Sequence, residues 1–119
     1  MADYLLDTSF LIDLMKGEGN AKRLHEKTKG EQSTSTVCVY ELAKFEDFDG
    51  SYLANKSVLP FSSEDADRAG DVFRRLRRDG EPIGETDSMI AGTAISRDLT
   101  LITRDTDFEK VTGLTTRFY

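Results

Sequence analysis

The chain has 119 residues, a length typical of a single domain. Its 22 acidic and 16 basic side chains give a net charge of −6, which excludes a basic, nucleic-acid-coating surface overall. A single cysteine, Cys38, and a single histidine, His25, exclude an internal disulfide and argue against a cysteine- or histidine-rich zinc site. No apolar segment approaches the roughly 20 residues of a membrane span, and no leader pattern opens the chain. We therefore expect a cytoplasmic protein without membrane association.

Apolar spacing predicts alternating strands and helices in the first half of the chain. A short buried strand precedes Asp7, and helical periodicity follows until Gly17. The ranges predicted next are a polar helix at 20–29, a strand rich in Ser and Thr at 32–37, and a helix at 39–48 whose apolar stripe includes Phe45 and Phe48.

The second half continues this alternation. Ser62 and Ser63 are predicted to cap a helix that ends at Gly80, and Thr86 is predicted to cap the next helix. The remaining predicted elements are strands at 57–61, 99–103 and 114–119 and a single helical turn at 105–110. This order favours an α/β fold in which helices cover both faces of a parallel sheet.

Several carboxylates are predicted to meet at one edge of that sheet. Ligands of open α/β sheets bind where the strands end. Asp7 ends the first strand, and Glu41 lies early in the helix after the second. Asp87 opens a later helix, and Asp105 and Asp107 follow the strand at 99–103. Taken singly, these residues have ordinary explanations as helix caps, turn formers or solvated side chains.

Gathered together, these carboxylates would repel one another unless a cation or protons neutralised them. Only oxygen ligands are available, so the expected ion is Mg²⁺ or Mn²⁺. Such an ion activates water and stabilises charge on a phosphodiester. Asp13 is expected to lie on the polar side of its helix, in solvent.

Four segments carry a resemblance to a known family. They are YLLDTS at 4–9, YEL at 40–42, TDSMIAGTA at 86–94 and LITRDTDF at 101–108. In order and spacing, over essentially the full chain, they resemble the PIN-domain ribonucleases, and most closely the VapC toxins of toxin–antitoxin pairs.

The resemblance implies a single PIN domain over residues 1–119, a three-layer α/β/α Rossmann-like fold with a five-stranded parallel sheet. It implies endonucleolytic cleavage of RNA, a VapB-like antitoxin as partner, and a homodimer. It also implies an Mg²⁺- or Mn²⁺-binding quartet with two supporting residues. The quartet is Asp7, Glu41, Asp87 and Asp105, supported by Ser9 and Asp107.

An RNA substrate needs local cations despite the acidic total. The candidates are clustered at one helix end and beside the quartet: Arg74, Arg75, Arg77, Arg78 and Arg104. A solvated helix C-terminus, where the macrodipole favours cations, explains the run of four equally well.

Readings from other classes fit less well. A haloacid-type phosphatase needs a second aspartate two residues after Asp7, where this chain has Ser9. A receiver domain needs an acidic pair after the first strand and a late lysine after a strand, and neither is present. The alternative that stays open is a catalytically silent PIN-like scaffold that binds protein or RNA.

Overall fold

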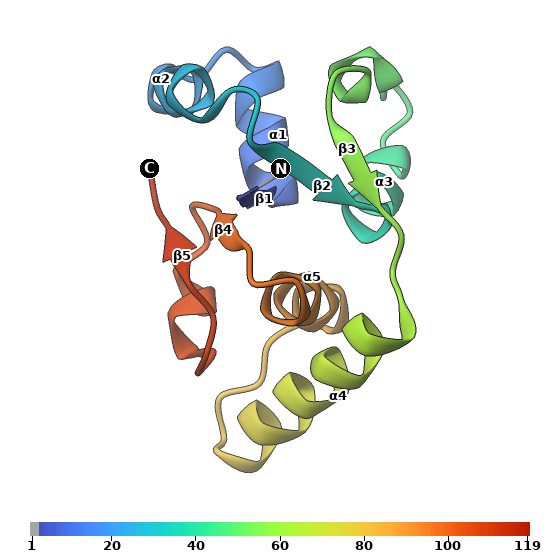
Figure 1. The fold of residues 1–119 in the computed structure, drawn as a ribbon, viewed down its shortest axis with the longest axis vertical. Helices are drawn as coiled ribbons and strands as arrows, with labels where there is room; N and C mark the ends of the chain where they lie inside the picture. Colours follow the sequence, from blue (N-terminus) through green and yellow to red (C-terminus); the bar gives the residue numbers. More distant parts are fainter. Residues whose placement is uncertain (1–2) are drawn as a thin grey trace.

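A computed structural model describes residues 3–119 and contains a five-stranded parallel sheet (Figure 1). The strands lie in the order β3-β2-β1-β4-β5, and every neighbouring pair is parallel. Their bounds are β1 Tyr4–Leu6, β2 Gln32–Ser35, β3 Ser57–Leu59, β4 Thr100–Ile102 and β5 Thr116–Arg117. The predicted α/β fold with a five-stranded parallel sheet is confirmed.

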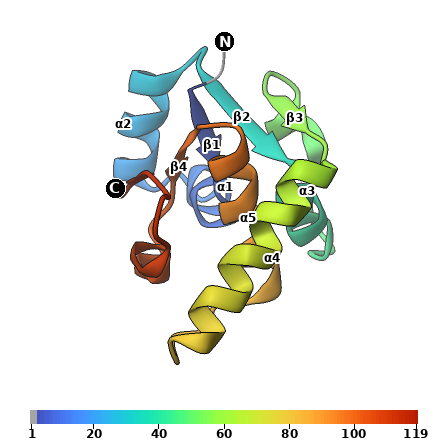
Figure 2. The ribbon, with the colours of Figure 1, turned by 60° about the horizontal axis from the view of Figure 1, so that its bottom comes forward.

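Helices cover both faces of this sheet. The chain moves from β1 toward β3 through one set of helices and returns to β4 through a second set, and right-handed crossovers place the two sets on opposite faces (Figures 1 and 2). The first set is α1 Thr8–Met15, α2 Gly19–Thr28, α3 Thr36–Ala43 and the short 3₁₀ helix η1 Gly50–Leu53. The second set is α4 Ser63–Arg78 and α5 Glu85–Ser96, followed after β4 by the 3₁₀ helix η2 Thr106–Lys110.

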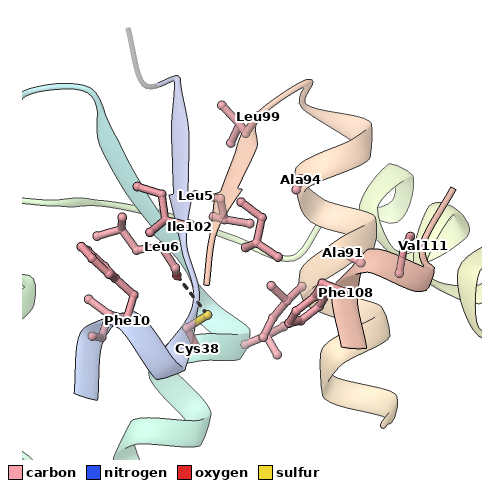
Figure 3. Packing of buried hydrophobic residues seen from close by; sticks show 14 of the residues in the cluster. Leu5, Leu6, Phe10, Cys38, Ala91, Ala94, Leu99, Ile102, Phe108 and Val111 are labelled. Atoms are coloured by element: carbon pink, nitrogen blue, oxygen red, sulfur yellow. Dashed lines mark hydrogen bonds between the residues drawn. The ribbon is translucent and has the colours of Figure 1, made fainter. Parts of the chain in front are cut away.

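The core lies on both sides of the two central strands. Leu5 and Leu6 of β1 are fully buried, as are Leu101 and Ile102 of β4. Figure 3 shows Phe10 and Cys38 on one side of these strands and Ala91, Ala94 and Phe108 on the other. This burial explains why the central strands are continuous apolar runs.

Cys38 belongs to this core, as expected for a small buried residue. Its side chain is fully buried, and its Sγ lies 3.5 Å from the carbonyl oxygen of Leu6. Burial raises the pKa of the thiol, which disfavours the reactive thiolate.

The predicted helix at 39–48 is placed too late in the chain. Helix α3 begins at Thr36 because the Ser35 hydroxyl caps it by accepting a bond from the Cys38 amide. It ends at Ala43, so Phe45 lies beyond the helix and 54% of its surface is exposed. The predicted apolar stripe therefore does not continue through Phe45.

The sheet order creates a switch point between β1 and β4. From β1 the connections lead to β2 on one side, whereas β4 and then β5 lie on the other. Loops leaving adjacent strands in opposite directions open a crevice at the carboxyl edge. Asp7 directly follows β1, and Thr103 to Asp105 directly follow β4. Within residues 3–119, no helix has the length and apolarity to cross a membrane.

Candidate active site

Asp7 lies at the start of α1 and is almost completely buried, with 4% of its surface exposed. It occupies the N-cap position, yet its side chain makes no capping hydrogen bond. Instead, its Oδ2 accepts hydrogen bonds from the hydroxyls of Ser9, at 2.8 Å, and Thr103, at 2.7 Å. Burial raises the pKa of Asp7, the two hydroxyls oppose that rise, and Glu41 adds to it. Helix capping therefore does not account for this carboxylate.

Glu41 projects from α3 and is held at both carboxylate oxygens. The Thr8 hydroxyl donates to Oε1 at 2.6 Å, and the Thr86 hydroxyl donates to Oε2 at 2.9 Å. Glu41 therefore connects the beginnings of α1 and α5, and the expectation of a freely solvated side chain does not apply to it.

Thr86 does not cap α5, contrary to the prediction. The helix begins two residues earlier than predicted, at Glu85, and Gly84 occupies the N-cap position without a side-chain bond. The Thr86 hydroxyl is directed to Glu41 instead. A helix cap is a local contact, whereas this contact spans 45 residues. The sequence pattern could not show which of the two contacts the Thr86 hydroxyl makes.

Asp87, in the first turn of α5, reports the convergence of the carboxylates. Its pKa is raised to about 6, first by burial and then by the charges of Asp7, Asp105, Glu41 and Asp107. The charges of the four other predicted acids, which come from separate segments, therefore act on Asp87.

Thr103 is a member of the site that the sequence analysis missed. Its hydroxyl donates to Asp7 Oδ2 and accepts from the Asp105 amide at 3.0 Å. Ser9 adds to the same network, because its hydroxyl lies 3.3 Å from that of Thr103. The signal in the sequence was a hydroxyl residue directly after a buried strand and two positions before Asp105.

Asp105 and Asp107 are positioned by η2. Asp105 is the N-cap residue of this helix and accepts a bond from the Asp107 amide at 2.9 Å. Asp107 is exposed and forms an ion pair with Lys110 at 3.3 Å. Asp107 thus lies at the solvent side of the site, whereas Asp7 lies at its buried end.

Arg104 is anchored beside the site by a residue predicted to be in solvent. Asp13 is buried, with 8% of its surface exposed, and its Oδ2 accepts from Arg104 Nε at 2.8 Å and from the Tyr119 hydroxyl at 2.6 Å. The prediction for Asp13 is wrong because both partners come from the far end of the chain. The Asp13 carboxylate in turn raises the pKa of Arg104.

The donor set fits a hard divalent cation in chemistry and in charge. The side chains offer carboxylate and hydroxyl oxygens, which Mg²⁺ and Mn²⁺ prefer. Burial and, after it, the neighbouring carboxylates raise the pKa of Asp87, and a bound cation would favour its charged form. Across residues 3–119, no three carboxylate, histidine or cysteine side chains are grouped closely enough to enclose a metal ion. Mg²⁺ is commonly bound by one or two carboxylates and completes its shell with water and substrate phosphate, so a closed cage is not required.

The predicted arginine run occupies the last turns of α4. Arg74 and Arg75 both pair with Asp71, at 2.7 and 3.1 Å. Arg77 and Arg78 complete the basic last turn, a position that the helix dipole favours. These side chains are exposed, so they are available to a ligand.

Comparison with known proteins identifies relatives over nearly the whole chain. The "tRNA(fMet)-specific endonuclease VapC" of Shigella flexneri is 30% identical and aligns with 98% of this chain and 97% of its own. The "Ribonuclease VapC2" of Haemophilus influenzae is 26% identical, with coverages of 98% and 97%.

Solved structures show the same fold. The chain superposes on a chain of VapBC2 from Rickettsia felis, bound to a promoter DNA fragment, with a TM-score of 0.86, 21% identity and 98% coverage of both chains. It superposes on one of DNA-bound VapBC from Salmonella typhimurium with a TM-score of 0.84, 25% identity and coverages of 99% and 98%. The PIN domain family model matches residues 4–114. This chain therefore belongs to the PIN domain family.

Proposed function

We propose that this protein is a metal-dependent endoribonuclease that hydrolyses RNA phosphodiester bonds, and that it is the toxin of a VapBC-type toxin–antitoxin pair. Relatives aligned over almost the whole chain carry the names endonuclease and ribonuclease. The single structural observation that supports the proposal is the environment of Asp87, where burial first, and then the charges of four other carboxylates, raise its pKa to about 6. A site built to gather this much negative charge is suited to a divalent cation.

One or two of Asp7, Asp87 and Asp105 would ligate Mg²⁺ or Mn²⁺ directly, the others would act through its coordinated waters, and Glu41 would hold a coordinated or attacking water. When bound, the ion lowers the pKa of water and offsets the negative charge that develops on the phosphodiester. The hydroxyls of Ser9 and Thr103 orient Asp7, and those of Thr8 and Thr86 fix Glu41. Carboxylates held this way need little rearrangement on reaching the reactive geometry. Asp107 assists from the solvent side.

The products follow from the balance of the reaction. Water adds to phosphorus, one phosphorus–oxygen bond of the RNA backbone breaks, and the departing oxygen takes up a proton. The products are one phosphate end and one hydroxyl end, and no covalent intermediate with the enzyme is needed. The side chains of the candidate site are carboxylates and hydroxyls, and the cysteine, Cys38, is buried in the core where it could not act as a nucleophile.

We further propose a VapB-like antitoxin and a second copy of the chain as protein partners, and action in the cytoplasm, where RNA is abundant. A cavity of about 500 Å³, lined in part by the sequence neighbours of Glu41 and Asp105, supports antitoxin docking. Its charged lining residues are Lys16, Asp47 and Arg104, and its apolar ones are Ile12, Met15, Leu42, Phe45 and Phe48.

RNA cleavage with and without Mn²⁺ tests the proposed activity. The wild-type protein should cleave RNA only with the ion, and Asp7→Asn should abolish that cleavage while the protein stays folded. Asp67→Asn, which makes the same change on an exposed part of α4, is the matched control and should cleave normally. Undiminished cleavage by Asp7→Asn would refute the assignment. A folded wild-type protein that never cleaves would favour the silent scaffold.

A further inference from the structure

A second, separate cavity lies along the flank of α4, against η2 and the segment after it. Its volume is about 380 Å³. The floor is apolar and is formed by Val72, Leu76, Ile95 and Val111. The charged lining consists of four cations and two carboxylates: Arg68, Arg75, Arg78 and Lys110, with Asp71 and Asp79.

The cations around this cavity, hereafter the α4 cavity, are only partly neutralised. Arg75 pairs with Asp71, and Lys110 pairs with Asp107 at 3.3 Å. Within residues 3–119, Arg68 and Arg78 form no ion pair. The protein as a whole has a net charge of −6, but the lining of this cavity has more cations than carboxylates. Such local positive charge attracts anions.

Two elements join the α4 cavity to the carboxylate site. Helix η2 begins directly after Asp105 and ends at Lys110, which lines the cavity. At the other end, α4 finishes at Arg78, and the chain then leads to the first turn of α5 and Asp87. Figure 1 shows α5 between α4 and the segment after β4. The α4 cavity and the carboxylates are thus linked along the chain through η2 and through the connection from α4 to α5.

We propose that the α4 cavity binds a backbone phosphate of the RNA strand at a distance from the bond that is cut, with the attached sugar or base against the apolar floor. This inference rests on the proposed endoribonuclease function and adds a second place where the RNA substrate contacts the protein. The residues that would bind the phosphate are Arg68, Arg75, Arg78 and Lys110. Arg74 and Arg77 of the predicted arginine run do not line the cavity.

The chemistry of the cavity favours nucleic acid over an acidic protein segment. Guanidinium groups bind phosphate oxygens through paired, planar hydrogen bonds. The apolar floor suits the face of a base or the carbon atoms of a sugar, because stacking and apolar contacts supply sequence-tolerant affinity for single strands. A cavity of this size also exceeds the needs of a lone phosphate and falls in the range of small-ligand pockets.

The salt dependence of RNA binding tests this assignment. The probe is a labelled single-stranded RNA of roughly 16 nucleotides, titrated in EDTA so that it is not cut. Arg68→Gln combined with Arg78→Gln should weaken binding. It should also reduce the slope of log affinity against log salt by up to about 0.7, the contribution of one phosphate contact on a single strand. Arg23→Gln combined with Lys27→Gln removes the same charge at exposed positions of α2, outside the cavity, and should leave the slope nearly unchanged.

Three results would overturn the proposal: an unchanged slope in the cavity double variant, equal losses in both double variants, or displacement of the RNA by poly-glutamate as readily as by unlabelled RNA. Lys110→Gln, at an exposed position, is a second cavity variant if the double variant melts early, and it should lower the slope in the same direction. In Mn²⁺, the cavity variants should raise KM and leave kcat unchanged. A wild-type protein that binds RNA through the cavity without cleaving it would support the cavity and refute the nuclease function.

Discussion

At the scale of single residues, one hydroxyl connects two of the proposed metal ligands. Thr103 is fully buried, donates to Asp7 and accepts from the backbone amide of Asp105. By donating to Asp7, Thr103 orients the carboxylate that follows β1 and lowers its pKa. Thr103 is therefore a positioning residue, because it acts on the reaction through Asp7.

Thr103→Val should lower metal-dependent RNA cleavage by roughly 10- to 100-fold, the usual cost of removing a partner that orients a metal ligand. Since the Thr103 hydroxyl lowers the pKa of Asp7, its loss should also move the acidic limb of the pH–rate profile to higher pH. Thr103→Ser keeps the hydroxyl and should restore both properties. A Thr103→Val protein with an unchanged pH profile would show that the hydroxyl has no influence on Asp7.

The sequence pointed to the charged residues proposed for this site but not to their neutral partners. Asp7 and Asp105 follow strands whose ends meet at one edge of a parallel sheet, and the resemblance to PIN-domain ribonucleases implied the set Asp7, Glu41, Asp87 and Asp105. The hydroxyls of Thr8, Thr86 and Thr103 were not, because their contacts join segments 33 to 96 residues apart. Asp13 was misjudged for the same reason, since Arg104 and Tyr119 neutralise and bury it from more than 90 residues away.

At the scale of elements, the pair α4 and α5 depends on one glycine. A Cβ atom at Gly92 of α5 would lie 2.5 Å from the backbone nitrogen of Ala69 and 2.7 Å from its Cα. These are distances that real Cβ atoms do not adopt, and backbone cannot give way as a flexible side chain can. Gly70, on α4, has open space around its Cα instead.

Gly92→Ala should lower the free energy of unfolding by about 1–3 kcal/mol, the usual cost of overpacking. Gly70→Ala makes the same chemical change in a helix without a clash and should raise it by about 0.5–1 kcal/mol. Urea denaturation of both variants measures the two effects. Equal behaviour of the two variants would mean that the two helices are farther apart than described here.

Helix boundaries at this scale were predictable where a cap is local. Ser62 caps α4 and exchanges bonds with Asp65 in a capping box, as its sequence position suggested. Helix α3 was placed too late because the apolar spacing continues through Phe45 and Phe48 after the helix has ended at Ala43. Apolar periodicity records which residues could share a face, not where the backbone leaves the helix.

At the scale of the whole molecule, folding accumulates charge at one edge of the sheet. The raised pKa values of Asp7 and Asp87 mean that the folded state binds protons more tightly than the unfolded chain does. For Asp87, the associated stability is present below about pH 4 and is lost as the pH rises through about 6. Without metal, the free energy of unfolding should therefore fall across this interval, and a bound divalent ion should reverse the loss by mass action.

The most direct test of this account is an NMR titration of the Asp87 carboxyl carbon, with and without Mg²⁺. In EDTA, Asp87 should titrate with a pKa of about 6, and Asp7→Asn should lower that value because one of the neighbouring charges is removed. Saturating Mg²⁺ should bring the pKa of Asp87 below its metal-free value, whereas NaCl of equal ionic strength should change it far less. An Asp87 that titrates near 3.8 in EDTA and is insensitive to both Asp7→Asn and Mg²⁺ would contradict a shared cation site.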